Sequence, residues 1–221
     1  MSESYQDTIE RLYSPLTQLN GESEENICQA ENQLKYRLPH SLREYYLLAG
    51  QEERLNNAND RLLNLSELSI KNQVLIFYVE NQSVNFFCIR VNEIALDNPP
   101  VYAANFEDLS NLELNCESLT QFFYTMNYWQ LVNGALENCA LTFECSQETI
   151  SLIESIWPEM MSISDVWKMR IFSKDQQLLC LLGDQTNCQL QIAASTPSEA
   201  RKITKLLPVE WEINEIKYFI S

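Results

Sequence analysis

The chain has 221 residues, of which 45% are hydrophobic and 21% charged, so it has a globular composition and room for one medium domain or two small ones. Its 15 Lys and Arg stand against 31 Asp and Glu, which gives a formal net charge of −16 and makes the chain repel nucleic acid at long range. These numbers exclude collagen-like and low-complexity classes and argue against a direct DNA or RNA binder.

In the first part of the chain, helices come before strands. Apolar spacing and capping residues predict three helices, over residues 4–13, from the Ser23 cap up to the Leu38-Pro39 break, and over 41–49 with Gly50 as the stop. A loop over 51–60 follows, and then strands over 74–79 and 84–91, joined by a turn in which Asn81 adopts the left-handed conformation. A strand over 101–104 and a helix over 118–133 complete this part.

The pattern then restarts after residue 137. It predicts a strand over 140–145, a helix over 147–157, strands over 166–172, 178–183 and 189–194, a helix over 197–207 and a last strand over 209–213. We therefore expect an α+β protein with two domains. Residues 1–137 would form a mostly antiparallel sheet flanked by helices, and residues 138–221 a second small α+β domain of unknown role.

The 7 cysteines are scattered and include no C-x-x-C pair. The amino-terminal residues lack an apolar core of signal-peptide length, and no segment approaches the roughly 18 apolar residues of a membrane span. We therefore expect a cytoplasmic protein with reduced thiols and no membrane association. If residues 177–192 form a hairpin that turns at 183–185, Cys180 and Cys188 face each other, but a cytoplasmic location disfavours a disulfide there.

The acidic residues are unevenly distributed. Residues 1–137 hold 8 basic and 20 acidic residues, residues 138–221 hold 7 and 11, and the Lys/Arg-free stretch 91–167 carries 12 Asp and Glu. Such a stretch is either a solubilising surface or a docking face for a basic protein. The candidate partner-binding residues are Glu107, Asp108, Glu113 and Glu117.

Motifs for catalysis are missing from the sequence. The sequence contains 1 histidine, His40, and no nucleophile-elbow pattern accompanies it. Neither zinc-finger spacing nor a phosphate-binding glycine loop occurs. Carboxylate pairs such as Glu107-Asp108 are expected by chance in so acidic a chain. We therefore expect a non-enzyme without cofactor or metal, with His40 as a surface residue at a helix start. An enzyme with an unrecognised site is the remaining alternative.

Four segments of the first domain share their order and spacing with a known family. They are the run from Leu38-Pro39 to Tyr46 closed by Gly50, the run from Asp60 to Leu68, the strand ending in Glu80-Asn81-Gln82, and Asp97-Asn98-Pro99-Pro100 followed by the helix with Leu119 and Phe122. Together they resemble the SUKH superfamily over about residues 1–135. Many members have Trp-Gly after the third segment, where this chain has Phe86-Phe87-Cys88.

The resemblance implies a non-catalytic binding protein. Bacterial members of this superfamily look like cytosolic immunity proteins that bind and block a toxin domain, often a nuclease, while the yeast members are regulators of cell-wall synthesis. The leading hypothesis is therefore a basic protein partner, with a nuclease toxin as the candidate. The alternative is a regulatory scaffold that binds a host signalling or envelope-related protein.

Overall fold

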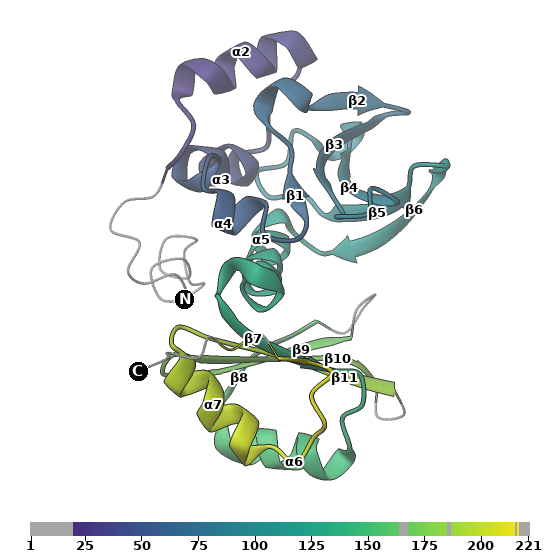
Figure 1. The fold of residues 1–221 in the computed structure, drawn as a ribbon. Coiled ribbons are helices and arrows are strands. Elements are labelled where there is room, and N and C mark those ends of the chain that lie inside the picture. The colour runs from purple at the N-terminus through teal and green to yellow at the C-terminus, as the bar shows by residue number, and fades with distance from the viewer. Residues whose placement is uncertain (1–19, 164–167, 185–186, 215, 217–221) are drawn as a thin grey trace. The chain divides into compact units, whose positions relative to one another are not determined.

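The computed structural model describes residues 20–163, 168–184, 187–214 and 216, and the chain divides into two compact units, residues 1–130 and 131–221 (Figure 1). Each unit combines helices with an antiparallel sheet, which confirms the α+β class. The structural division falls after Gln130, whereas the sequence analysis placed it after Glu137. The helix expected over residues 4–13 lies outside the described residues.

The described part of the first unit holds the following elements: α2 (Glu24–Leu34), α3 (His40–Ala49), α4 (Glu53–Asn56), β1 (Arg61–Leu62), the 3-10 turn η1 (Leu65–Glu67), β2 (Ser69–Lys71), β3 (Val74–Val79), β4 (Asn85–Arg90), the 3-10 turn η2 (Val91–Glu93), β5 (Val101–Asn105), β6 (Asp108–Cys116) and α5 (Leu119–Gln130). Its strands run in the order β1-β3-β4-β5-β6, with β2 also paired to β3. In this sheet β6 is an edge strand.

Local chemistry explains both ends of α2. The hydroxyl of Ser23 accepts the backbone N–H of Asn26 at 3.1 Å and so caps α2, as its sequence indicates. Lys35 ends the helix in the left-handed conformation with φ 63°.

The β3–β4 turn differs from the sequence prediction. Asn81 was expected to take the left-handed conformation, but Ser83 is the residue with positive φ.

Strand β6 was not expected from the sequence. Most of its residues are polar, two adjacent polar residues at 110 and 111 interrupt the alternation, and Asp, Asn, Ser and Glu are poor strand formers. Pairing with β5 holds it in the sheet, with Asp108 opposite Asn105 and Glu113 opposite Ala103. The register shifts between these pairs, so β6 carries extra residues that bend it.

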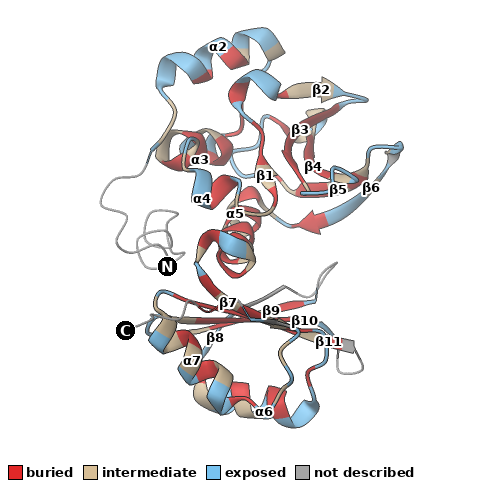
Figure 2. Cartoon of the chain, in the orientation of Figure 1, coloured by how far each residue is buried: buried red, intermediate tan, exposed pale blue. Residues whose placement is uncertain are grey.

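The core of the first unit is aromatic. Phe122 of α5 lies against Phe77, Tyr78 and Phe87 of the sheet, with ring centroids 5.0–5.4 Å apart. Tyr45 of α3 stacks on Phe123 of α5, with centroids 3.7 Å apart. All of these side chains are buried (Figure 2). Helices α3 and α5 and the sheet therefore close on one aromatic layer.

The described part of the second unit holds the following elements: the π-turn η3 (Leu131–Ala135), β7 (Asn138–Thr142), α6 (Gln147–Ile156), β8 (Glu159–Ile163), β9 (Met169–Lys174), β10 (Gln177–Asp184), β11 (Asn187–Ala194), α7 (Pro197–Leu206) and β12 (Ile213–Asn214). The strand order is β12-β7-β11-β10-β9-β8, with every pair antiparallel. Both α6 and α7 lie on one face of this sheet (Figure 1), where Ile150, Ile153 and Ile203 join an aliphatic core.

Three expectations for this unit were wrong. Strand β8 was missed, and the last strand is β12 rather than residues 209–213. In the β10–β11 hairpin Cys180 faces Gln191, while Gly183 faces Cys188, so the two cysteines are not opposite each other. Neither cysteine is part of a disulfide.

Candidate functional site

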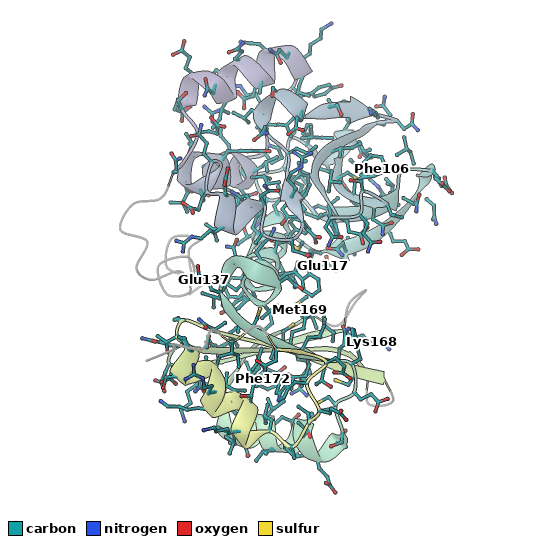
Figure 3. The ribbon with its side chains drawn as sticks, viewed as in Figure 1. Phe106, Glu117, Glu137, Lys168, Met169 and Phe172 are labelled. Atoms are coloured by element: carbon teal, nitrogen blue, oxygen red, sulfur yellow. The ribbon has the colours of Figure 1, made fainter. Side chains whose placement is uncertain are left out.

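The four candidate partner-binding residues lie on the β5–β6 hairpin and its exit. Glu107 is in the turn, Asp108 begins β6, Glu113 is within β6, and Glu117 follows its last residue. All four are exposed. Figure 3 shows Phe106 in the turn and Glu117 near the far end of β6. We call β5, the turn, β6 and Glu117 together the acidic hairpin.

The carboxylates of the acidic hairpin are spread out rather than gathered at one point. Asp108 pairs with Asn105, and Cys116, next to Glu117, pairs with Val101. These partners on β5 are four positions apart, which corresponds to about 14 Å along the strand. Such spacing suits contact with an extended surface and does not suit a metal site or a catalytic carboxylate pair.

Two large apolar side chains lie among these carboxylates. Phe106 is 40% exposed and Leu114 is 41% exposed, although the ring of Phe106 also packs against Phe86 with centroids 4.7 Å apart. Sequence reasoning missed both residues, because an exposed apolar residue cannot be told from a core residue by type alone. The acidic hairpin therefore offers apolar contact area as well as charge.

Arg90 is the positively charged residue nearest in sequence to the acidic hairpin, and it contacts an aromatic ring of the sheet. Its guanidinium carbon lies 4.0 Å from the centroid of the Tyr102 ring on β5. The Tyr102 hydroxyl donates to Glu93 Oε1 at 3.1 Å. Burial, followed by the charge of Glu93, raises the pKa of Tyr102. From Val91 to Gln130 the first unit contains no other Lys or Arg.

The segments that resemble the SUKH superfamily meet in pairs. Ser41 donates both its backbone N–H and its hydroxyl to the carbonyl of Asp97, each at 2.9 Å. Asp60 Oδ1 accepts the backbone N–H of Asn81 at 3.1 Å. The first segment is thus bonded to the fourth and the second to the third, so these motifs hold the fold together.

A buried polar network lies behind the second and third of these segments. Gln130 of α5 donates to the Tyr78 hydroxyl at 2.8 Å and to the carbonyl of Asp60, and its own side-chain oxygen accepts the N–H of Asn59 at 2.7 Å. Asp60 is only 1% exposed, and this burial, opposed by the hydrogen bond from Asn81, raises the pKa of its carboxyl group to about 6. The network is closed to substrate, so we assign it a structural role.

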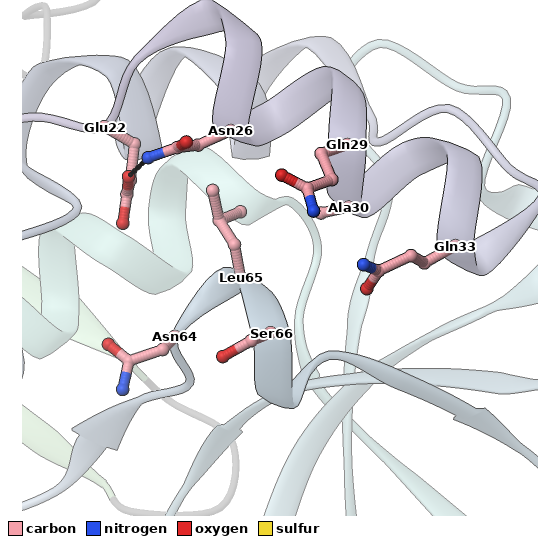
Figure 4. Close-up of a pocket in the computed structure, with 8 residues that line it drawn as sticks. All are labelled: Glu22, Asn26, Gln29, Ala30, Gln33, Asn64, Leu65 and Ser66. Carbon is pink, nitrogen blue, oxygen red and sulfur yellow. Dashed lines mark hydrogen bonds between the residues drawn. The ribbon is translucent and has the colours of Figure 1, made fainter.

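A groove of about 330 Å³ lies between α2 and η1 (Figure 4). Its polar lining consists of carboxamide, hydroxyl and carboxylate groups, from Glu22, Asn26, Gln29, Gln33, Asn64 and Ser66. One internal bond is present, from Asn26 Nδ2 to Glu22 Oε2 at 3.0 Å.

The second unit has a larger groove of about 530 Å³ beside the start of α6. Its lining includes Glu144, Glu210 and Glu212, the 49%-exposed ring of Phe143, and two cysteines, Cys145 and Cys188. The backbone N–H of Phe143 donates to Glu212 Oε2 at 3.3 Å. This groove is therefore acidic and contains sulfur.

The remaining candidates for chemistry are dispersed. His40 begins α3 at the surface, and its Nε2 lies 3.6 Å from Glu44 Oε2 one turn later. In the described ranges, no three His, Cys, Asp or Glu side chains come together in a way that would hold a metal ion. Of the helices that the structure describes, none is both long enough and apolar enough to cross a membrane.

Comparisons with protein-family models, with curated proteins and with solved structures give no match to this chain. The function is therefore argued from the chain's own residues.

Proposed function

We propose that this protein is a non-catalytic binding protein of the immunity type, which neutralises a toxin domain by docking a basic surface of that toxin on the acidic hairpin. A nuclease is the candidate toxin. The observation that carries the proposal is the exposure of Glu107, Asp108, Glu113 and Glu117 along one hairpin, within a stretch that contains no Lys or Arg.

The physics of nuclease recognition favours this pairing. A nuclease presents positive charge to the phosphates of its substrate. An acidic partner surface accelerates encounter with such a face and selects against wrong partners. Charge alone contributes little lasting affinity, and the exposed side chains of Phe106 and Leu114 supply apolar area that a partner can bury.

The hydrogen bonds within the first unit support the proposal that it is a binding module. The four segments that resemble the SUKH superfamily are joined to one another by Ser41–Asp97 and Asp60–Asn81 hydrogen bonds. These residues are engaged in bonds that hold the fold, whereas the four carboxylates of the acidic hairpin face solvent. A binding module needs this combination of a fixed scaffold and an exposed recognition surface.

The test begins with capture of partners by the tagged chain from lysate of its own source cells, at low and at high salt. Each basic protein retained is then produced separately and titrated with the wild type and with a variant reversed at Glu107, Asp108, Glu113 and Glu117. We expect the reversal to weaken binding by at least about 100-fold at low salt, because it changes several charge pairs of about 1 kcal/mol each.

A matched control carries the same change in net charge at exposed glutamates that are not part of the acidic hairpin, namely Glu25, Glu44, Glu53 and Glu210. Its affinity should stay near that of the wild type. Equal loss in both variants would mean that only net charge matters and would contradict docking on the hairpin. Capture of housekeeping signalling or envelope-related proteins, without inhibition of any toxin activity, would favour the regulatory scaffold.

A further inference from the structure

Two cysteines of the second unit lie side by side. Cys145 is in the loop between β7 and α6, and Cys188 is in β11. The backbone N–H of Cys145 donates to the carbonyl of Cys188 at 2.9 Å, and the two side chains lie close enough for Cys188 to raise the pKa of the Cys145 thiol. This backbone hydrogen bond limits the distance between the two Cα atoms to about 6.8 Å, since the backbone nitrogen lies about 1.5 Å and the carbonyl oxygen about 2.4 Å from its own Cα atom. Disulfides span Cα distances of up to about 6.8 Å.

The pair differs from the other buried cysteines in its surroundings. Cys145 is 8% exposed and Cys188 is 6% exposed, and both line the acidic groove of the second unit. Cys180, which is 1% exposed, does not line it. A small reagent therefore reaches the pair through the groove without unfolding of the sheet.

We propose that Cys145 and Cys188 are a modification site, at which a small cationic disulfide converts the two thiols into a reversible internal disulfide. The thiolate of one cysteine attacks a sulfur of the small disulfide, forms a mixed disulfide and releases one small thiol. The second cysteine then attacks the protein-bound sulfur and releases the other small thiol. The protein pair is oxidised by two electrons, the reagent is reduced by two, and both protons end on the released thiols.

The charge of the groove decides which reagent reacts. Glu144, Glu210 and Glu212 line the groove and are exposed to solvent. They attract a cationic disulfide and repel an anionic one, and salt screens both effects. At low salt we expect cystamine, which carries two ammonium groups, to form the bridge at least about tenfold faster than oxidised glutathione, which is anionic.

The environment of the thiols also sets a pH dependence. The hydrogen bond with Cys188, followed by burial, raises the pKa of Cys145, and no basic side chain lines the groove among the described residues. The titratable groups around the pair are the other thiol of the pair, the Cys180 thiol, which interacts with Cys188, and the three glutamates of the groove. Negative charge on any of these groups disfavours a thiolate at the pair. Bridge formation should therefore speed up by about tenfold per pH unit from pH 7 to pH 9, since only the thiolate attacks.

The experiment treats the full-length reduced chain with cystamine, quenches it with acid, alkylates the remaining thiols and maps the peptides by mass spectrometry. The expected product is a peptide pair joined through Cys145 and Cys188, lighter by two hydrogen atoms than the reduced pair and restored by dithiothreitol. Exposed Cys28 should take a mixed disulfide and so reports that the reagent is active.

Matched variants assign the bridge. Cys145→Ser and Cys188→Ser should each abolish it, whereas Cys180→Ser should leave it intact. Peptide mapping of the wild type decides the question even if a serine variant fails to fold. A wild type that carries only mixed disulfides, or a bridge from Cys180, would overturn the proposal. So would equal rates with cystamine and oxidised glutathione at low salt. None of these outcomes depends on the identity of a protein partner.

Discussion

The two units of this chain bury different cores. The largest fully buried aromatic side chains all lie in the first unit except Phe172, while the core of the second is built mainly from Ile, Leu and Cys. Buried tyrosines bring hydroxyl groups with them, and each buried hydroxyl needs a partner. The first unit meets that need with an internal amide network, so its stability depends on polar geometry as well as on apolar area.

The largest expected effect tests the aromatic layer itself. Phe122→Ala removes a ring that contacts Phe77, Tyr78 and Phe87, and we expect it to lower the free energy of unfolding by about 3–5 kcal/mol. Urea titration followed by hydrogen exchange at residue resolution measures the loss. Protection should fall in residues 20–130 first. As a counterpart, Leu179→Ala should cost about 2–5 kcal/mol and act first on the second unit; a loss shared equally by both units would contradict separate cores.

The second prediction concerns Asp60, whose folded-state pKa of about 6 lies above the ordinary value of 3.8. Below pH 4 the carboxyl group is protonated in both states and has no effect. Between pH 4 and 6 the unfolded chain loses the proton while the folded chain keeps it, so stability falls as the pH rises. The shift corresponds to about 3 kcal/mol, reached above pH 6.

Asp60→Asn removes this titration while its side-chain oxygen still accepts the N–H of Asn81. The stability of the variant minus that of the wild type should therefore increase by about 3 kcal/mol between pH 4 and pH 7. Parallel urea titrations at several pH values measure the difference, in which the other carboxylates cancel. A difference that does not change with pH would show that Asp60 is ordinary in the folded state.

A smaller effect should follow from removal of one hydroxyl in the first unit. The Tyr45 hydroxyl lies 3.0 Å from Asn56 Oδ1 and 2.9 Å from Asn127 Oδ1. Tyr45→Phe keeps the ring stacked and deletes this hydrogen-bonding group, at an expected cost of about 1–3 kcal/mol. Tyr124→Phe, at a half-buried position, is the control and should cost less. If the two substitutions cost the same in thermal unfolding, the amide network would not set the stability of the first unit.

The smallest expected effect is the loss of stability when a helix cap is removed, and it should be similar in the two units. Thr196 caps α7 and Ser23 caps α2 through side-chain oxygens that accept backbone N–H groups. Thr196→Ala and Ser23→Ala should each cost about 1 kcal/mol. Because this chemistry is local, the cost should not differ between the units. Circular dichroism during denaturation measures both, and a much larger loss at either position would reveal tertiary contacts of the cap.

The candidate site was predictable only in part. Composition identified Glu107, Asp108, Glu113 and Glu117, because a stretch without Lys or Arg is visible in the sequence. It did not identify β6, which is a strand only because β5 pairs with it. Nor did it mark Phe106 and Leu114 as exposed, since exposure depends on which neighbours cover a side chain.

Several helix starts and the most apolar strands could be predicted from local sequence alone. Ser23, Thr196 and Pro197 start helices wherever the chain is placed, because their capping and backbone preferences act within a few residues. The runs that became β3, β10 and β11 are apolar enough to form strands with any suitable partner.

Tertiary structure alone decided what those elements do together. It brought Asp60 into hydrogen-bonding distance of Asn81, Ser41 of Asp97, and Cys145 of Cys188. It also separated Cys180 from the partner expected across its hairpin, because the register set Gln191 opposite it. Such pairings join residues far apart in the chain, and register and burial depend on every layer that packs around them, so no local pattern encodes them.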